Sequence, residues 1–318
     1  MKAPGIVSNS GSKKRPGELK RVWQQNYQLW LIILIPFAWL ILFKYWPMYG
    51  AQIAFRSYRA IDGVWGSKWV GFANFTKLFR NYMFPRIIKN TLIVSFYQLL
   101  VSFPFPIILA LALHNSLHSK FKKSVQMITY MPHFISTVVL VGMIMQFTNP
   151  HVGLINKLIV ALGGTAQDFM ASRTGFYHMY VWSNVWQNCG WGTIIYLAAL
   201  SSVNMDLHEA AMIDGAGRFK RMLYIDIPCI IPTAIVLLIM DVGRIMAIGF
   251  EKAFLMQNLM NISSSEIIST YAYKVGLAQA AADFSYSTTI SLFNSIVNMI
   301  LIMIVNSIAA KWGETSLW

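Results

Sequence analysis

Residues 209 to 228 read EAAMIDGAGRFKRMLYIDIP and lie between two long apolar stretches. This segment contains six charged residues and two glycines, although the chain as a whole has few charges. Of the 318 residues, 56% are hydrophobic and 12% are charged, whereas a typical soluble domain is about 25% charged. The composition is typical of an integral membrane protein, so the quoted segment is expected to lie outside the lipid.

The apolar stretches predict six membrane-spanning helices. A helix needs about 20 predominantly apolar residues to cross a bilayer, and strands of a membrane barrel would give segments of only about ten alternating residues. A span at 227–250 contains two charged residues, Asp241 and Arg244. The five uncharged spans are 22–43, 90–119, 124–156, 174–205 and 284–310. We therefore predict an all-α membrane protein with six transmembrane helices.

Lysine and arginine positions predict the orientation of the chain. They cluster in the N-terminal tail and in the loops near 114–124 and 202–228. An even number of spans places both termini on one side, so we expect both to be cytoplasmic. The predicted parts are a tail at 1–27, a first transmembrane helix at 28–47, an external basic segment at 48–87, a five-helix core at 88–310 with the loop 202–228, and a C-terminal tail at 311–318.

The predicted external segment is an exception to this charge distribution. It holds six basic residues against a single acid, Asp62. Such a surface would suit an acidic ligand or partner. Alternatively, the segment is an amphipathic stretch that lies on the membrane.

The quoted segment predicts two short helices joined by a bend. Asp206 and Glu209 have the spacing of a capping box at the start of a helix, and Gly215 and Gly217 can end or kink that helix. The basic sequence RFKRMLY predicts a second short helix before Pro228. The alanines would let another surface approach closely, while the charges keep the element out of lipid. We interpret it as a docking element on the cytoplasmic side.

The spacing of this segment resembles a family pattern. EAA, three residues, Gly, nine residues and I-x-I-P are similar to the EAA-x3-G-x9-I-x-L-P pattern of permease subunits of bacterial ATP-binding-cassette importers, with Ile227 in place of the usual Leu. The resemblance covers roughly 88–318 and extends to FKKSVQMITYMPHFIS, GFEKAFLM and GETSLW. These stretches resemble the carbohydrate permeases that handle oligosaccharides, and the alginate-type subunits in particular.

The resemblance implies a type I importer permease fold with a coupling helix that sits in a cleft of a cytoplasmic ATPase. Glu209 would meet a basic residue of that ATPase, and Gly215 would permit the turn; alternatively, Glu209 only caps its own helix. The implied ATPase-coupling residues are Glu209, Ala210, Ala211, Asp214, Gly215 and Arg218. The implied partners are a second homologous permease, two ATPase subunits, an external solute-binding protein, membrane lipid and an oligosaccharide, at the bacterial cytoplasmic membrane.

The chain itself has no pattern for nucleotide chemistry. It lacks the G-x4-G-K-S/T sequence that binds phosphates, so ATP and Mg²⁺ are expected on the partner ATPase and no cofactor in this chain. The sequence shows no cluster of nucleophile, base and orienting group, so it does not predict an enzyme site. His114 and His118 have helical metal-pair spacing, but no nearby carboxylate or cysteine completes a site. The net charge of +14 is interpreted as a topology signal rather than as nucleic-acid binding.

Polar side chains inside the predicted spans are candidates for the substrate pathway. Asp241 and Arg244 are three apart in the fifth span and should face the bundle interior, either as a structural pair or at a gate. The fourth span offers amides and an aromatic ring, which suit sugars, and the sixth offers a polar stripe. The candidates are Asn184, Gln187, Asn188, Trp191, Asp241, Arg244 and Asn294, the last with Ser287, Ser291 and Asn298.

Other interpretations of these patterns are open. Amides and serines in membrane helices often only bond neighbouring helices. An ion-gradient-driven transporter would be expected to show several intramembrane carboxylates, whereas Asp241 is the only one inside a predicted span. A membrane-embedded enzyme would need a catalytic cluster. The sequence therefore favours a non-catalytic permease subunit of an ATP-driven importer.

Overall fold

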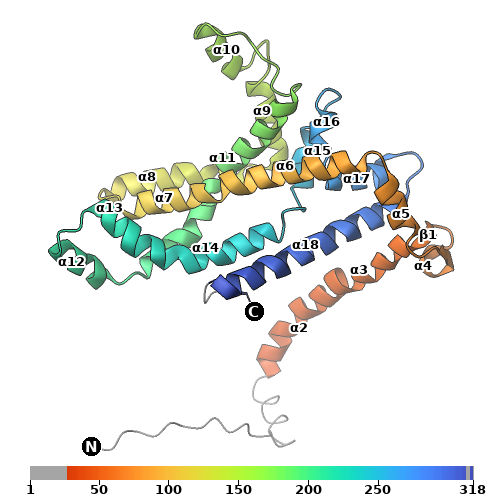
Figure 1. Ribbon diagram of the computed structural model, residues 1–318, viewed down its shortest axis with the longest axis horizontal. Coiled ribbons are helices and arrows are strands. Elements are labelled where there is room, and N and C mark those ends of the chain that lie inside the picture. Colours follow the sequence, from red (N-terminus) through yellow and green to blue (C-terminus); the bar gives the residue numbers. More distant parts are fainter. Residues whose placement is uncertain (1–26, 313–315, 318) are drawn as a thin grey trace, which may run out of the picture. The chain divides into compact units, whose positions relative to one another are not determined.

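The computed structural model describes residues 27–312 and 316–317. Helices dominate it (Figure 1), which confirms the prediction of a helical protein. Contacts divide the chain into two units, 1–52 and 53–318. We describe each unit by itself.

The first unit contributes one long apolar helical segment. It runs through α2 (Tyr27–Leu40), η1 (Ile41–Tyr45), α3 (Trp46–Met48) and η2 (Tyr49–Phe55). No residue of α2 is buried within the protein. A helix that is apolar on all faces is suited to lipid. The segment includes the predicted transmembrane helix 28–47, whereas the predicted tail 1–27 lies almost wholly outside the described residues.

The second unit is a helical bundle in which α11 is central. Its longer helices are α6 (Phe84–Ser102), α7 (Pro104–His114), α8 (Ser119–Tyr130), α9 (Thr137–Phe147), α11 (Arg173–Ser201), α14 (Ile227–Val242) and α18 (Phe284–Trp312). α11 packs against α6, α7, α8 and α14. A Cβ atom on Gly190 would lie 2.1 Å from the carbonyl oxygen of Thr129 in α8. Small residues thus bring α11 close to its neighbours.

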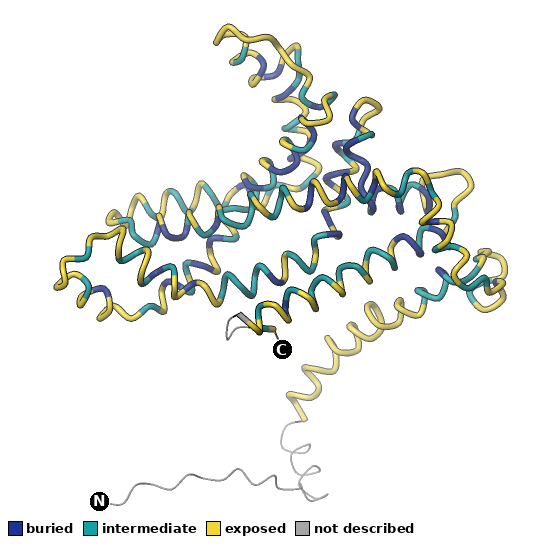
Figure 2. The backbone as a smooth tube through the Cα atoms, viewed as in Figure 1, coloured by how far each residue is buried: buried dark blue, intermediate teal, exposed yellow. Residues whose placement is uncertain are grey.

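Three clusters of buried apolar side chains form the core in the described part of this unit. In one of them, Phe176 and Tyr180 of α11 pack with Met256 and Ile267 at the ends of shorter helical segments, and Figure 2 shows buried stretches distributed along the bundle. The shorter helical elements are η3 (Met131–Phe134), α10 (Leu154–Ala161), α15 (Phe250–Leu255), α16 (Ile262–Ser265), α17 (Ile268–Tyr273) and η5 (Lys274–Ala278). They place additional polar side chains beside α11.

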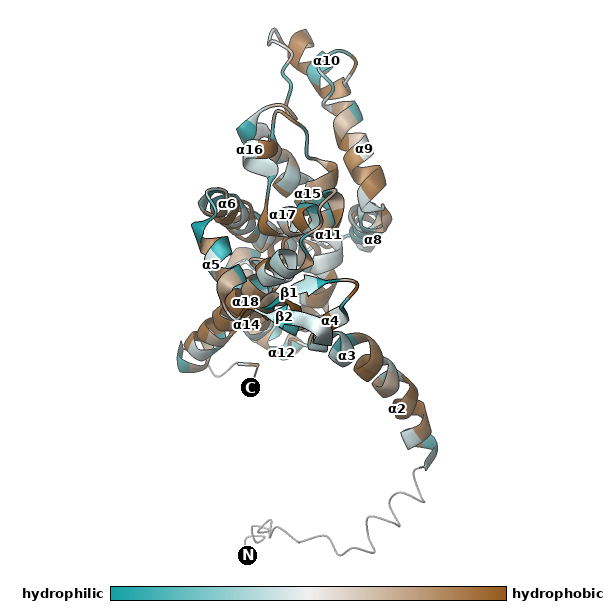
Figure 3. Ribbon diagram, turned by 90° about the vertical axis from the view of Figure 1, so that its right-hand side faces the viewer, coloured by the Kyte–Doolittle hydropathy of each residue, from teal (hydrophilic) through white to brown (hydrophobic). Residues whose placement is uncertain are grey.

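Four segments of the described chain are long and apolar enough to cross a membrane. They are Tyr27–Phe55, Phe84–His114, Arg218–Val242 and Phe284–Lys311, and Figure 3 colours most of their length hydrophobic. The bent pair α8 and α9 would make a fifth. α11 has 29 residues, but its amides, serine and histidine reduce its hydropathy. The predicted total of six is consistent with this arrangement and requires both α11 and the bent pair.

The predicted span 124–156 is not one continuous helix but two helical segments joined by a sharp bend. The segment Ser119–Phe134 meets α9 at an angle of 101°. Pro132 lies in the short η3 turn, Ile135 is extended, and Ser136 starts α9 by accepting a hydrogen bond from the Val139 N–H at 3.4 Å. A proline and a new N-cap within five residues end one helix and begin another.

The predicted fifth span, 227–250, is too long. α14 ends at Val242, and residues 243–249 form turns before α15. At Gly243, a Cβ atom would lie 2.8 Å from the Cδ1 atom of Ile302 in α18. The chain thus turns at a point packed closely against α18, and Arg244 does not share a helix with Asp241.

The basic segment 48–87 is a folded cap rather than a loose amphipathic stretch. It contains a two-stranded antiparallel ribbon, β1 (Arg56–Arg59) with β2 (Ser67–Trp69), followed by α5 (Ala73–Arg80), and a short α4 (Gly63–Gly66) lies between the strands. The Tyr58 N–H donates to Ser285 Oγ at 2.8 Å. Lys77 pairs with Asp283 at 2.7 Å. These contacts attach the cap to the start of α18.

Several of the cap's charges serve this internal structure. Arg56 donates to the Ser67 carbonyl at 2.9 Å and lies over the Trp69 ring, and Arg59 pairs with Asp62 at 3.6 Å. The basic surface available to an acidic ligand is therefore smaller than the sequence suggests.

Candidate functional site

The loop between α11 and α14 forms the predicted helix, bend and helix. The first helix is α12 (Met205–Ile213), the second is α13 (Arg218–Arg221), and η4 (Met222–Asp226) continues directly into α14. In Figure 1, α12 and α13 lie at one end of the bundle, beyond the ends of α7 and α14.

The predicted capping box is wrong. Asn204 is the N-cap of α12, and its Oδ1 atom accepts a hydrogen bond from the Asp206 N–H at 3.0 Å. Asp206 is already inside the first turn. There, the negative charge of a carboxylate interacts favourably with the helix dipole. Glu209 lies one turn further on and does not cap the helix. Its carboxylate makes no hydrogen bond or ion pair within residues 27–312 and is left for other contacts.

Gly215 makes the bend. Its φ angle is +75°, which L-residues other than glycine rarely adopt. The Gly215 N–H donates to the Met212 carbonyl at 3.1 Å, and the Ala216 N–H donates to the Ala211 carbonyl at 2.8 Å. These two bonds form a Schellman motif, which ends α12 and turns the chain towards α13.

The predicted coupling residues lie on the surface of this element. Ala211 is half-buried, and the exposed ones are Glu209, Ala210, Asp214, Gly215 and Arg218. Large apolar side chains are exposed beside them, namely Met205, Leu207, Met212, Ile213 and Phe219. Exposed apolar patches rimmed by polar residues are typical of protein or membrane interaction sites.

His208, which precedes the exposed Glu209, points into the protein. His208 is buried, and its Nε2 atom lies 3.1 Å from Oδ1 of Asp226 at the end of η4. His114, at the end of α7, lies 3.9 Å from the same oxygen. His118, which has helical metal-pair spacing to His114, is exposed and not part of this cluster. Three chain segments therefore meet behind the exposed face of α12.

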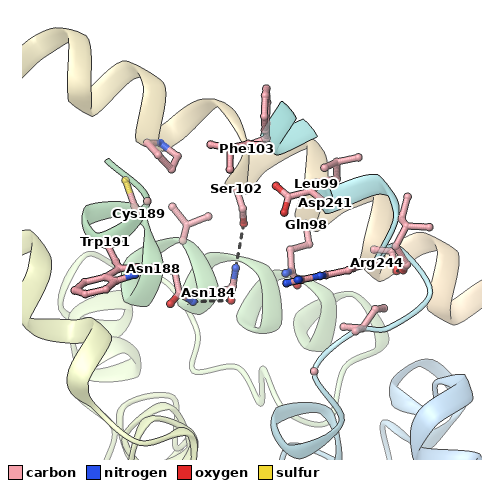
Figure 4. Close-up of a pocket in the computed structure, with 18 of the residues that line it drawn as sticks. Gln98, Leu99, Ser102, Phe103, Asn184, Asn188, Cys189, Trp191, Asp241 and Arg244 are labelled. Carbon is pink, nitrogen blue, oxygen red and sulfur yellow. Dashed lines mark hydrogen bonds between the residues drawn. The ribbon is translucent and has the colours of Figure 1, made fainter. Parts of the chain in front are cut away.

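A cavity of about 650 Å³ lies between α6, α7, α11 and α14. Its size falls within the range of about 300–1,000 Å³ that is usual for ligand sites. Five predicted pathway residues line it (Figure 4): Asn184, Asn188, Trp191, Asp241 and Arg244. Gln187 lines a neighbouring cavity with Asn184 and Asn188, and Asn294 lines a separate one.

Hydrogen bonds between helices hold the amides of α11 in place. Asn188 donates to Asn184 Oδ1 at 2.9 Å, and Asn184 donates to Ser102 Oγ at 3.3 Å. Gln187 donates to the Ile135 carbonyl at 2.9 Å. The Trp191 ring stacks on His133 with centroids 4.5 Å apart. These side chains line cavities and also join neighbouring segments. Their arrangement is therefore compatible both with a role in the substrate pathway and with a role in helix packing.

The charged residues of the cavity are not a close ion pair. Asp241 comes from α14 and Arg244 from the turn after it, and both are exposed to the cavity. The Arg244 backbone N–H donates to the Asp241 carbonyl at 3.1 Å, but the described residues show no ion pair within 4.0 Å between the two side chains, so neither charge is neutralised by direct contact with the other. Figure 4 shows the Arg244 side chain beside Gln98. A guanidinium and an amide can bind carboxylate and hydroxyl groups.

The polar stripe of α18 divides in two. Ser287 donates to the Ala272 carbonyl at 2.7 Å, and Asn298 accepts from the Met246 N–H at 3.0 Å, so both hold neighbouring segments. Ser291 and Asn294 line the separate cavity. Oδ1 of Asn294 is buried without a hydrogen bond in the described chain.

The polar residues of these cavities that sequence reasoning missed include Gln98, Ser102, His133 and Lys252. Gln98 and Ser102 interrupt the apolar run of α6 one turn apart, which is a detectable signal. His133 and Lys252 lie in short elements whose position depends on the tertiary structure. Lys252 is almost fully buried, donates to the Tyr180 carbonyl at 2.9 Å and lies 4.8 Å from the centre of the Tyr180 ring.

Burial lowers the pKa of Lys252, which lies outside the long apolar helices, from 10.5 to about 7. Between these two values the unfolded chain binds a proton that the folded chain does not, so stability should rise as the pH increases above about 7. We expect the unfolding midpoint of the wild type to rise between about pH 6 and about pH 9. Lys252→Met should flatten this rise in thermal unfolding in detergent.

The control is Lys68→Met, because Lys68 is exposed. This variant should keep the wild-type slope. Equal slopes in the wild type and Lys252→Met would contradict the assignment.

Together, a membrane bundle with a polar central cavity and an exposed helix–bend–helix at one end is the arrangement expected of a transport permease. Residues 102–313 match the family of binding-protein-dependent transport system inner membrane components. The chain belongs to this family of permease subunits, which confirms the predicted family and the prediction of a non-enzymatic subunit.

Relatives with assigned names include two proteins of Bacillus subtilis (strain 168). LplB is 42% identical over 290 residues, which cover 91% of each chain. The polygalacturonan/rhamnogalacturonan transport system permease protein YteP is 41% identical over 306 residues, covering 96% of this chain and 94% of that protein. These similarities extend across the cap as well as the bundle.

A solved structure has the same fold. It is the bacterial alginate ABC transporter in complex with an alginate pentasaccharide-bound periplasmic protein, with a TM-score of 0.85 and 34% identity. The match covers 93% of this chain and 99% of that chain. The predicted type I importer fold is confirmed.

Proposed function

We propose that this chain forms part of the pathway by which an ATP-driven importer moves acidic oligosaccharides across the bacterial cytoplasmic membrane. The observation that carries the proposal is Arg244, a guanidinium exposed to a cavity whose other polar groups, apart from Asp241, are uncharged. A guanidinium binds a carboxylate with two parallel hydrogen bonds. Two similar proteins are named for transport of polygalacturonan/rhamnogalacturonan and of alginate, and uronate residues of such polymers carry carboxylates.

The amides of α11 would bind sugar hydroxyl groups in this pathway. Asn184 and Asn188 are fixed by their bonds to each other and to Ser102, which reduces the entropy lost when a ligand binds. Trp191 has its ring partly covered by His133, so its exposed edge and remaining face contribute apolar contact. Asp241 would accept hydrogen bonds from hydroxyl groups at the other side of the cavity.

This chain would work with three kinds of partner subunit. A second, homologous permease subunit would complete the pathway, two ATPase subunits would bind ATP and Mg²⁺, and a solute-binding protein would deliver the sugar from outside. The exposed Glu209 and its apolar neighbours on α12 support an ATPase contact at this element. Both termini would then lie on the cytoplasmic side with α12.

ATP binding would move the coupling segment, and the bundle would follow. η4 continues from α13 into α14 without a break, and α14 carries Asp241 into the cavity. A shift at the coupling segment would therefore reach the cavity wall through one continuous helix, as expected of rigid-body alternating access. Family membership, rather than any residue of the cavity, argues against the ion-gradient alternative.

The test is substrate-stimulated ATP hydrolysis by the importer purified with its co-purifying subunits, reconstituted in lipid with its binding protein. We expect an oligogalacturonate or alginate oligosaccharide to stimulate hydrolysis, and a neutral oligosaccharide of equal length to have little effect. The control omits the binding protein. Equal stimulation by both sugars would contradict selection for acidic substrates, and absence of a co-purifying ATPase would contradict the assembly.

A further inference from the structure

Behind the exposed face of α12 lies a buried cluster of His114, His208 and Asp226. One ligating atom from each residue lies within 4.8 Å of the other two. The side chains come from the end of α7, the middle of α12 and the start of α14. They are 94 and 18 residues apart along the chain, so no local sequence pattern reveals the cluster.

The carboxylate of Asp226 is held in a fixed orientation. Its Oδ2 atom accepts a hydrogen bond from Asn115 Nδ2 at 3.0 Å. Its Oδ1 atom faces both histidines, with the Nε2 atom of His208 at 3.1 Å and that of His114 at 3.9 Å. Asp226 is fully buried, and a buried anion needs a positive group beside it.

Neither Oδ1 of Asp226 nor Nε2 of His208 is aligned for a hydrogen bond with another group in the described chain, and both atoms are buried. They are close enough for one but do not point directly at each other. Instead, one ligating atom from each of the three residues lies within 4.8 Å of the other two, where three chain segments meet.

We propose that His114, His208 and Asp226 bind a divalent transition-metal ion of the zinc class. Imidazole nitrogens favour such ions, whereas magnesium and calcium favour oxygen ligands. Zinc lies about 2.0–2.2 Å from nitrogen and oxygen ligands in tetrahedral sites, which places ligand atoms about 3.4 Å apart. The two measured separations from Oδ1 lie on either side of this value. Asn115 provides the outer hydrogen bond that orients a metal-binding carboxylate.

The ion joins α12 to two membrane helices. With it, the residue next to Glu209 is fixed to the end of α7 and to the start of α14. Because the docking face and the metal site lie on opposite sides of one nine-residue helix, movement imposed on α12 is transmitted to both helices. The metal site does not depend on which sugar the importer carries.

The experiment measures zinc bound to the full chain, purified with the subunits that accompany it and stripped with a chelator. Zn²⁺ is titrated, bound zinc is quantified by elemental analysis, and thermal unfolding is recorded with and without the ion. The variants His114→Gln and His208→Gln each remove one ligand. The matched control is His118→Gln, because His118 is exposed and four residues from His114.

We expect one additional Zn²⁺ per chain in the wild type and in His118→Gln, with a rise in the unfolding midpoint. Removing a ligand should weaken binding about 100-fold or more, since loss of an outer-shell partner alone costs about 10–100-fold. Should His208→Gln fail to assemble, His114→Gln gives the same comparison at a half-buried position. Zinc binding of equal strength in the wild type and His114→Gln would overturn the proposal, as would the absence of zinc from the wild type, which would leave an ion pair only.

Discussion

Gly215→Pro is expected to abolish ATP-driven uptake while leaving the chain in the membrane. Proline fixes φ near −65°, whereas Gly215 has a φ of +75°. Proline also lacks the N–H that bonds to the Met212 carbonyl. The Schellman motif would be lost, and α12 would no longer present Glu209 and its apolar neighbours in one orientation. Gly215→Ala keeps the N–H but costs about 1–2 kcal/mol in this region of backbone space, so uptake should fall about tenfold.

The measurement is sugar uptake and ATP hydrolysis in the same reconstituted importer. The matched control is Gly217→Ala, because Gly217 has a φ of −66° and open space around it. Glu209→Lys tests the surface separately, since it reverses an exposed charge without changing the bend. We expect both Gly215→Pro and Glu209→Lys to uncouple hydrolysis from transport. Normal uptake in both variants would show that this element does not couple the permease to an ATPase.

Arg244→Gln is expected to reduce uptake of acidic oligosaccharides about 10- to 100-fold. The estimate follows from about 1.5–3 kcal/mol for a hydrogen bond to a charged group. Glutamine can still donate a hydrogen bond, so a neutral oligosaccharide should lose much less. The loss should be concentrated in kcat/KM for the acidic substrate, measured as uptake at low sugar concentration.

Asp241→Asn is the matched control in the same cavity. It removes the opposite charge and keeps the size of the side chain, so acidic uptake should be retained or increased. Equal losses for acidic and neutral sugars in Arg244→Gln would indicate a structural role for Arg244. Unchanged uptake in the double variant would mean that neither charge takes part in transport.

Local patterns predicted the coupling segment well because its structure is local. Glycine is the residue type best suited to the positive φ at position 215, and α12 before it is only nine residues long. The error at its start has a local cause too. Asn204 and Asp206 are both good N-cap residues, and the spacing to Glu209 favoured the wrong one.

The cavity was predicted only in part. Asn184, Asn188 and Trp191 share one stripe of α11 and could be grouped by helical periodicity, whereas Gln187 and Asn294 line other cavities. The break after Val242 was not visible in the local pattern, and it lies where Gly243 is packed closely against Ile302 of α18. Arg244 lines the cavity but was assigned to the wrong element.

The sequence by itself determined that this chain is a helical membrane protein with a charged helix–bend–helix between two apolar stretches, because apolar length, charge and glycine placement act over neighbouring residues, and its motif spacing indicated the permease family. Only the tertiary structure decided where the helices break, which polar groups share a cavity, and that His114 and His208 meet at Asp226. Those features arise from contacts between residues distant in the chain, and such contacts leave no periodic pattern in a single sequence.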